Sequence, residues 1–380
     1  MGANGASDWL FVPDPGTEPT QSPVQYIENQ ETAMIVPEGM VVKLDPKDDF
    51  LHEPEAASNY NESVYIDMFD SRTSLGAWLR IGNRPNEGYA EVSVCMYLPD
   101  GRVAFWFVRP EIQDNSELNA GGLRVQVAEP FKTLEVSYEG PVILLDDPMD
   151  LQNAREAFKQ SPRADASMRF TLSGVSPMHG GEIVNRDGSP WQLDPELAAY
   201  RGHMEQHLSV TGEMRIDGEI YPFDGHGFRD KSWGPRHWGN LYWHKWLPIT
   251  FGPDFGVLLA LMGRPDQQPE VVGHIWRGER LIPLTDARLN VTYDDEFVQR
   301  SIMLDLETAE GTTTVSGEVV TAIPLQHRRI AEDGTETRVR IIKAMTQFKC
   351  EGRQTTGMSE FLDLMVGDRP ISLTTYSLDV

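Results

Sequence analysis

Residues 90–108 read Ala-Glu-Val-Ser-Val-Cys-Met-Tyr-Leu-Pro-Asp-Gly-Arg-Val-Ala-Phe-Trp-Phe-Val. Apolar residues occupy alternate positions at the start and fill the end, a pattern typical of two β-strands. Pro99-Asp100-Gly101 between them combines the fixed φ of proline with the positive φ that glycine tolerates, which favours a tight turn. The stretch therefore predicts a β-hairpin.

The same period of two continues through most of the chain after residue 64. The clearest runs are residues 64–69, 134–138, 168–172, 207–216, 256–261, 271–276, 287–293, 302–306, 313–320 and 339–345. Helical spacing is confined to residues 148–160 and a short stretch at 195–200. About sixteen antiparallel strands are too many for one barrel. We therefore predict an all-β protein of two antiparallel barrels or sandwiches packed together, with few short helices.

Composition divides the chain further and limits its partners. Residues 1–58 are rich in Pro, Glu, Asp and Asn, and they predict an irregular N-terminal arm. The Pro- and Asp-rich stretch 186–196 is the expected seam, which gives β domains at 59–195 and 196–380. A net charge of -25 argues against nucleic acid or an anionic membrane as a partner.

Targeting signals are not evident. The longest strongly apolar run, residues 255–262, is too short to cross a bilayer, and the first residues lack the pattern of a signal peptide. Cys95 and Cys350 form neither a metal spacing nor a disulfide framework. We expect a cytoplasmic protein without integral membrane association, and a homodimer is one option for its assembly.

The richest stretch for chemistry is His-Gly-Phe-Arg-Asp-Lys-Ser-Trp-Gly-Pro-Arg-His-Trp at residues 226–238. Ionisable groups and indoles at this density are typical of a partly enclosed pocket. The alternative is a structural corner in which an Arg-Asp pair is buried under tryptophan. The pocket interpretation makes catalytic candidates of Asp230, Arg229, Arg236 and His237, and substrate-binding candidates of His226, Trp233, Trp238, Trp243 and Trp246.

Two further polar sets are candidates for contact with a substrate. His203, Glu205 and His207 alternate along a predicted strand and therefore share a face. Imidazole and carboxylate at this spacing can hold a metal, but a third imidazole at a compatible spacing is missing, so we expect substrate contact and no metal. The other set is Asn61, Glu62, Arg80 and Asn83, whose alternative is a solvated loop.

Several catalytic classes lack their motifs. The sequence contains no Gly-x-Ser-x-Gly elbow, no phosphate loop and no dinucleotide fingerprint, so we expect no cofactor. Acid-base chemistry by Asp230, His237, His226 or the alternating set remains. Tryptophan beside a carboxyl raises the carboxyl's pKa and a neighbouring arginine lowers it, and the sequence leaves the balance open.

The core of the rich stretch, Gly-x-Arg-Asp-x-Ser-Trp-Gly-x-Arg at residues 227–236, resembles the conserved block of a bacterial family of uncharacterised tandem lipocalin-like proteins. Asn61-Glu62-Ser63, Arg80, Asn83, Pro85-Asn86 and Gly357-x-x-Glu360 also look like that family, and the match spans residues 60–365. The chain is more distantly similar to carotenoid 1,2-hydratases, AttH-type proteins and lipocalin-like Diels-Alderases. Lys231 stands where the family often has His, so no role is assigned to that side chain.

The resemblance implies two lipocalin-like barrels with a ligand cavity at or near their junction. It also implies cofactor-independent chemistry, or binding alone, on hydrophobic molecules such as terpenoids, steroids or lignin-type aromatics, as in aromatic compound catabolism. We expect a lyase, hydratase or isomerase in which Asp230 is the acid or base. Arg229 and Arg236 would orient it or stabilise an oxyanion, and His237 would assist proton transfer. The alternatives are a lipocalin-like carrier and a metal-dependent enzyme that uses His203, Glu205 and His207.

Overall fold

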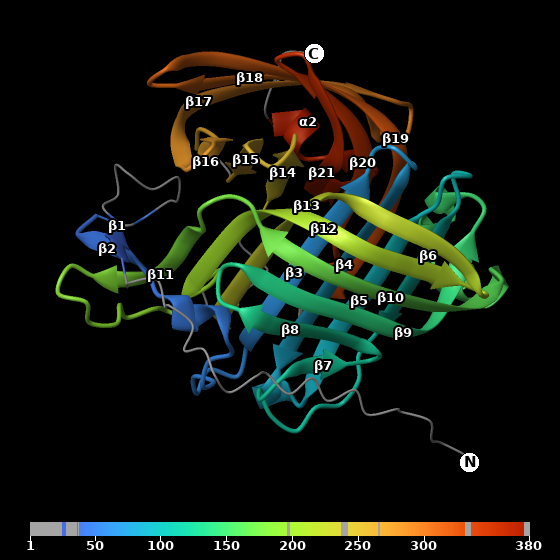
Figure 1. Cartoon of the computed structure of the whole chain (residues 1–380), viewed down its shortest axis with the longest axis horizontal. Coiled ribbons are helices and arrows are strands. Elements are labelled where there is room, and N and C mark those ends of the chain that lie inside the picture. The colour runs from blue at the N-terminus through green and yellow to red at the C-terminus, as the bar shows by residue number, and fades with distance from the viewer. Residues whose placement is uncertain are drawn as a thin grey trace.

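The long strands of the chain close into two antiparallel β-barrels, one above the other in Figure 1. The computed structural model describes residues 25–27, 36, 38–195, 198–236, 242–264, 267–330 and 336–375. The all-β prediction is confirmed, and the helices in the described residues are short: η1 (Pro46–Asp49), η2 (Pro85–Glu87), η3 (Pro148–Asn153), α1 (Ala154–Gln160) and α2 (Ser372–Thr375). The helix expected at residues 148–160 is therefore present as η3 and α1.

The first barrel is a ring of strands in which β10 closes the sheet by pairing with both β9 and β12. Its members are β3 (Tyr60–Asp70), β4 (Leu75–Arg84), β5 (Tyr89–Tyr97), β6 (Val103–Val108), β9 (Thr133–Leu145), β10 (Arg163–Gly174), β12 (Gly202–Ile216) and β13 (Glu219–Pro235). Beside the ring lie β1 (Gln25–Ile27), β2 (Met40–Leu44), β7 (Leu118–Ala120), β8 (Leu123–Glu129) and β11 (His179–Asn185).

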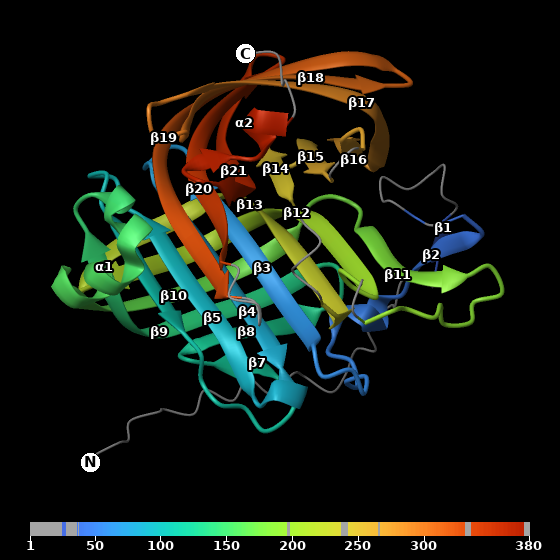
Figure 2. The same ribbon diagram turned by 180° about the vertical axis from the view of Figure 1, so that it is seen from behind.

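The second barrel is closed by pairing of its first strand with β21. Figure 2 shows it from behind. Its members are β14 (Trp243–Thr250), β15 (Phe255–Gly263), β16 (Glu270–Arg277), β17 (Arg280–Tyr293), β18 (Gln299–Thr308), β19 (Gly311–Ile330), β20 (Glu336–Cys350) and β21 (Arg353–Val366), with β22 (Arg369–Pro370) beside it.

Turns of the expected kind join neighbouring strands. The hairpin of residues 90–108 is β5 and β6, and the Leu98 amide donates to the Arg102 carbonyl across its turn at 2.9 Å. Asp217 and Gly218 join β12 to β13 with φ of 48° and 84°. Two consecutive positive φ values are typical of the tight hairpin turn that matches the twist of the flanking strands.

Two sequence predictions differ from the structure. The chain passes from the first sheet to the second between β13 and β14. The domain boundary was predicted near residue 195, but β12 and β13, which follow that point, pair with the first barrel. The division into folding domains stays a prediction. The supposedly irregular arm contains β2, which pairs with β11. Composition missed this because short strands carry too few residues to show a period.

Alternation along the strands divides most of the buried apolar side chains into three large clusters, and three small clusters lie beside them. On β3, Val64 and Ile66 face the inside of the first barrel, whereas Tyr65 and Phe69 face the second barrel. A separate cluster that includes Phe255 fills the second barrel. The cluster between the barrels also receives Trp246, Leu258 and Met345 from the second barrel. The barrels are therefore joined by a packed apolar seam, and side chains on the seam face of β12 and β13 lie between them.

Candidate active site

The rich stretch found in the sequence lies along β13, and its residues alternate between two sides of the barrel wall. Arg229 and Lys231 point to the inside, where they pair with Asp49 and Glu62. Asp230 and Ser232 point to the seam side. Neighbours in a strand face opposite ways, so one motif supplies two separate polar clusters.

The seam-side cluster is built on an imidazole-carboxylate pair. Nε2 of His203 on β12 lies 2.9 Å from Oδ2 of Asp230 on β13. The backbone register pairs Glu205 with Asp230, which places the two carboxylates on the same face. The side chains of His203 and Asp230 are 19% and 27% exposed. The pair is therefore partly enclosed and still reachable from solvent.

The charges of this pair are set by its neighbours. Burial alone lowers the pKa of His203, but Asp230 and Glu205 outweigh it and raise the pKa to about 9. Burial alone raises the pKa of Asp230, but His203, Arg236 and Arg80 bring it below its ordinary value. At neutral pH the pair is therefore an imidazolium and a carboxylate. The sequence left open whether the pKa of Asp230 is raised or lowered. In the structure the neighbouring cations lower it by more than burial raises it.

Amide, hydroxyl and guanidinium side chains lie next to the pair. Arg80 donates from Nη2 to Oδ1 of Asn61 at 3.4 Å and from Nη1 to Glu91 at 3.3 Å. Arg236 donates from Nη1 to the hydroxyl of Ser232 at 3.0 Å. Burial and repulsion from Arg80 lower the pKa of Arg236 to about 10. The two guanidinium groups therefore sit near each other, and an oxygen that gains negative charge would be stabilised between them.

Aromatic rings and a further histidine complete the surroundings. The Tyr200 ring stacks on His203 with centroids 5.0 Å apart. Nε1 of Trp246 donates to Oε1 of Glu205 at 3.1 Å. His244 on β14 is half-buried, and burial lowers its pKa despite the attraction of Glu360 and Glu205. Sequence reasoning missed both residues: Tyr200 is three residues from His203 but precedes the strand pattern, and His244 is brought close by the contact between the barrels, which leaves no local signal.

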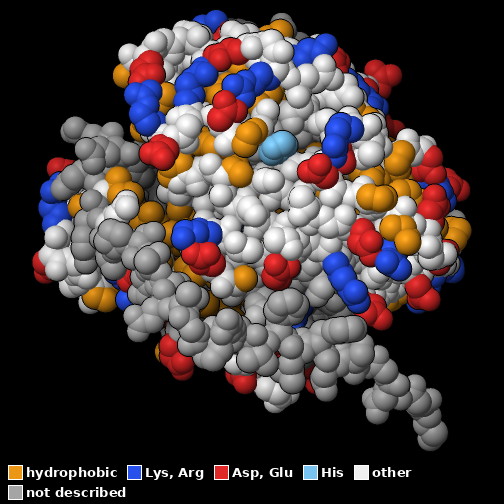
Figure 3. Space-filling model, in the orientation of Figure 1, with side chains coloured by type: hydrophobic (Ala, Val, Ile, Leu, Met, Phe, Trp, Pro, Cys, Tyr) orange, Lys and Arg blue, Asp and Glu red, His pale blue; other side chains and the backbone are white. Residues whose placement is uncertain are grey.

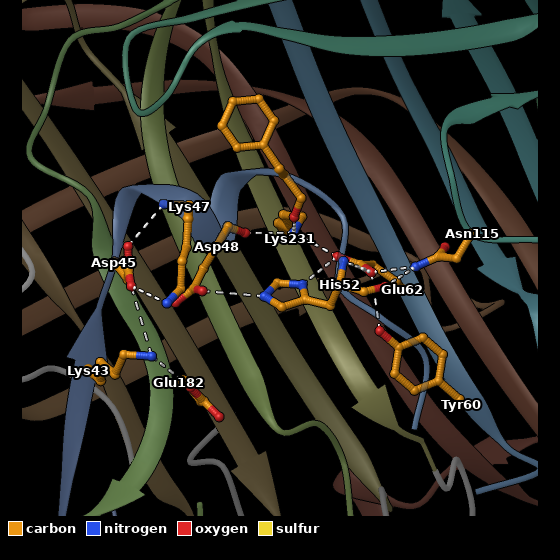
Figure 4. A network of polar contacts seen from close by, with 11 residues as sticks. Lys43, Asp45, Lys47, Asp48, His52, Tyr60, Glu62, Asn115, Glu182 and Lys231 are labelled. Carbon is orange, nitrogen blue, oxygen red and sulfur yellow. Dashed lines mark hydrogen bonds and ion pairs between the residues drawn. The ribbon is translucent and has the colours of Figure 1, made fainter. Parts of the chain in front are cut away.

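The inner cluster is a buried ion-pair network at one mouth of the first barrel, which Figure 4 shows from close by. Nζ of Lys231 donates to Oε1 of Glu62 at 2.8 Å and to the carbonyls of Asp48 and Phe50 at 2.7 Å each. Nδ1 of His52 also lies 2.8 Å from Oε1 of Glu62. Burial alone raises the pKa of Glu62, but Lys231 and His52 bring it down to about 2.

Other predicted site residues extend this inner network. Arg229 pairs with Asp49 at 2.8 Å and donates to Gln206 at 3.0 Å, so it does not contact Asp230. Asn83 donates to Oδ1 of Asn115 at 3.0 Å. On this side of β13 the arrangement is the structural corner that the sequence analysis gave as its alternative.

A cavity of about 980 Å³ opens beside the inner network. Its apolar wall includes Leu51, Val64, Leu118, Val125 and Leu134. Arg229 and Lys231 line the end of it that faces the network. The cavity therefore lies on the opposite side of β13 from the pair formed by His203 and Asp230.

The three residues of the metal-dependent alternative, His203, Glu205 and His207, are only partly together. Among the residues that the structure describes, His203, Glu205 and Asp230 form the one group of His, Cys, Asp and Glu whose ligand atoms all lie within 4.8 Å of one another. His207 is absent from it, because four residues along a strand span roughly 13 Å. Its Nδ1 instead lies 2.8 Å from the hydroxyl of Thr250. Sharing a face was a correct inference, but sharing a site was not.

The predicted tryptophan wall is also dispersed. Trp233 stacks on His52 at 4.3 Å in the inner cluster, and Trp243 is fully buried inside the second barrel. Among the predicted tryptophans that the structure describes, Trp246 alone reaches the seam-side cluster, through its bond to Glu205. His226 lies four residues before Asp230 on β13, near Asp70 and Asp224. His237 and Trp238 fall outside the described residues.

A family model described as a domain of unknown function, DUF7064, matches residues 45–365. The chain belongs to this family. The matched region of the DUF7064 chain contains both barrels and both polar clusters. No curated protein matches the chain in sequence.

Solved structures resemble this DUF7064 protein in fold. The AttH-type protein NE1406 of Nitrosomonas europaea has a TM-score of 0.52 at 12% identity, over 83% of this chain and 97% of that one. CghA with Sch210972 gives 0.46 at 12%, over 82% and 90%. Kievitone hydratase of Nectria haematococca gives 0.43 at 10%, over 83% and 91%. The predicted resemblance to AttH-type proteins is thereby confirmed at the level of the fold.

The visible surface of the protein carries a mixture of side-chain types. Figure 3 shows acidic and basic side chains interspersed with apolar ones over the visible face. None of the helices in the described part of the chain combines the length and apolar character needed to cross a membrane.

Proposed function

We propose that this DUF7064 protein is a cofactor-independent lyase, hydratase or isomerase that acts on a bulky hydrophobic or aromatic molecule at the seam between its barrels. The observation that carries the proposal is the contact of 2.9 Å between His203 and Asp230 in a partly exposed position. Two oppositely charged titrating groups with shifted pKa values in a partly enclosed position are typical of acid-base sites.

The resting pair can move a proton in either direction. The imidazolium of His203 can give its proton to a substrate, which leaves a neutral ring beside the Asp230 carboxylate. Alternatively, Asp230 accepts a proton from carbon or water through Oδ1 while His203 holds Oδ2. Arg80 and Arg236 would stabilise an oxygen that becomes negative during the transfer. Tyr200 would offer an aromatic surface to the substrate.

The direct test is turnover of terpenoid, steroid and lignin-type aromatic compounds, followed by mass spectrometry and chromatography. Asp230→Asn keeps the shape of the side chain and removes its titration, so turnover should fall by about 10²- to 10⁴-fold. Asp224→Asn is the matched control, since its side chain is 67% exposed on the same strand. Equal rates in the Asp230→Asn variant and the wild type would refute the acid-base assignment.

A second candidate is a carrier that holds a hydrophobic ligand in the mouth of the first barrel. The cavity of about 980 Å³ with its apolar wall favours it, since small-molecule pockets are commonly about 300–1,000 Å³. Leu118→Trp would fill the cavity without changing the seam. If it abolishes binding of an apolar fluorescent probe while Asp230→Asn binds normally and no compound is converted, the carrier is correct.

A further inference from the structure

Three histidines meet beyond Glu205, at the contact of the two barrels. His179 comes from β11, His207 from β12 and His274 from β16. The ring centroids are 4.9 Å apart for His179 and His274, and 5.5 Å for His207 and His274. The three residues are 5%, 0% and 1% exposed. This histidine cluster is therefore closed to bulk water and includes both barrels.

Hydrogen bonds fix which nitrogen carries the proton in two of the rings. Nδ1 of His179 lies 3.3 Å from Oε2 of Glu205, and a carboxylate only accepts, so Nδ1 carries the hydrogen. Nδ1 of His207 lies 2.8 Å from the hydroxyl oxygen of Thr250. Thr250 gives its own hydrogen to the Gly227 carbonyl at 2.8 Å, so it accepts from His207. When each ring carries this one hydrogen, its Nε2 bears a lone pair.

These lone pairs have no donor. Nε2 of His179, Nε2 of His207 and both nitrogens of His274 are buried and lack a hydrogen-bond partner. A neutral imidazole has one N–H and one lone pair, so His274 leaves the cluster with three lone pairs and a single hydrogen. Neutral imidazoles with free lone pairs are the form that binds metal ions.

We propose that His179, His207 and His274 bind one divalent transition-metal ion of the zinc class, which joins the two barrels. With metal-nitrogen distances of about 2.0–2.1 Å, two imidazoles on a tetrahedral ion have ring centres about 5 Å apart. The two observed centroid distances agree with this spacing. The ligand nitrogens of the three rings do not all lie within 4.8 Å of one another, so binding requires the rings to move towards the ion.

The surroundings already support such ligands. Metal-bound histidines usually donate their other nitrogen to a carboxylate or another oxygen, which holds the ring in orientation. Glu205 does this for His179, and Thr250 does it for His207. The seam-side pair of His203 and Asp230 is not part of the ligand set, so the metal proposal stands apart from the proposed function.

The test is metal binding by the full chain after removal of metal with a chelator. We expect one Zn²⁺ per chain by calorimetry, and one Co²⁺ per chain with visible absorption bands of a low-coordinate site. His274→Phe and His179→Asn should each weaken Zn²⁺ binding by more than about 100-fold, since loss of a supporting partner alone costs about 10- to 100-fold. Circular dichroism establishes that each variant is folded.

Two controls define the site. His226→Phe changes a histidine of β13 outside the cluster and should bind Zn²⁺ as the wild type does. His203→Asn breaks the alternative group of His203, Glu205 and Asp230 and should also retain binding. A folded wild type that binds neither ion overturns the proposal, as does loss of the ion in His203→Asn with retention in His274→Phe. Failure to find turnover would leave this titration unchanged, so the two proposals fail separately.

Discussion

The charge of His203 is the most direct measure of the seam-side site, because it can be observed without a substrate. Its pKa of about 9 lies above the ordinary value of 6.5. At about 1.4 kcal/mol per pKa unit, this shift favours the imidazolium by about 3 kcal/mol. The figure is an upper limit, since both side chains of the pair are partly exposed and water screens their attraction.

Asp230→Asn removes the larger of the two attractions that raise this pKa and leaves Glu205 in place. Burial then regains weight, and the pKa of His203 should fall by at least one unit. Titration of the ring by NMR of the ¹⁵N-labelled protein measures it in the wild type and in the variant. Asp224→Asn should leave it unchanged, because that side chain is exposed and pairs with Arg72.

The same shift predicts how stability depends on pH. A pKa raised on folding adds stability that is complete below pH 6.5 and is lost as the pH rises through about 9. The Asp230→Asn variant should lose most of this dependence between pH 6 and pH 10 in urea unfolding. A wild-type His203 that titrates near 6.5, or an unchanged pKa in Asp230→Asn, would refute the electrostatic account of the pair.

Three further predictions concern stability. Glu62→Gln leaves the Lys231 ammonium buried with one charged partner fewer, so chemical denaturation should show a loss of about 3–5 kcal/mol; Glu310→Gln, in a pair whose members are about half exposed, should cost under about 1 kcal/mol, and equal losses would contradict the assignment. The pKa of Glu62, about 2, predicts that its contribution is present above pH 4.5 and is lost as the pH falls through about 2, a dependence that acid titration should show the Gln variant to lack. Gly263→Ala would place a Cβ 1.9 Å from the Trp243 ring, and thermal unfolding should reveal a loss of about 1–3 kcal/mol unless that ring can move.

The sequence predicted the strands well because each one carries its own period of two. The hairpin at residues 90–108 and the helical stretch at 148–160 needed only local information. The sequence could not predict the closure of each ring, since pairing between β3 and β13 or between β14 and β21 joins segments that lie far apart in the chain. The boundary predicted near residue 195 precedes β12, whereas the chain passes from one sheet to the other between β13 and β14.

The candidate site was found in part, for a related reason. The motif at residues 227–236 was recognised as one cluster, although its odd and even positions face different sides of β13. That parity was available in the sequence: Arg229 and Asp230 are neighbours, so in a strand they could not share a side. Trp243 and Trp246 likewise differ in parity, and only the second reaches the seam. The contribution of His244 depends on contact between the barrels, which no local pattern encodes.

The two-sided motif of β13 also restricts how this family can change in length. A single residue inserted or deleted before Arg229 would turn Asp230 towards the barrel mouth and Arg229 towards the seam. Both clusters would lose their partners in one step, since Asp49 and His203 are held by other elements. A substitution on this strand therefore affects one cluster at a time, whereas a change of one residue in its length affects both.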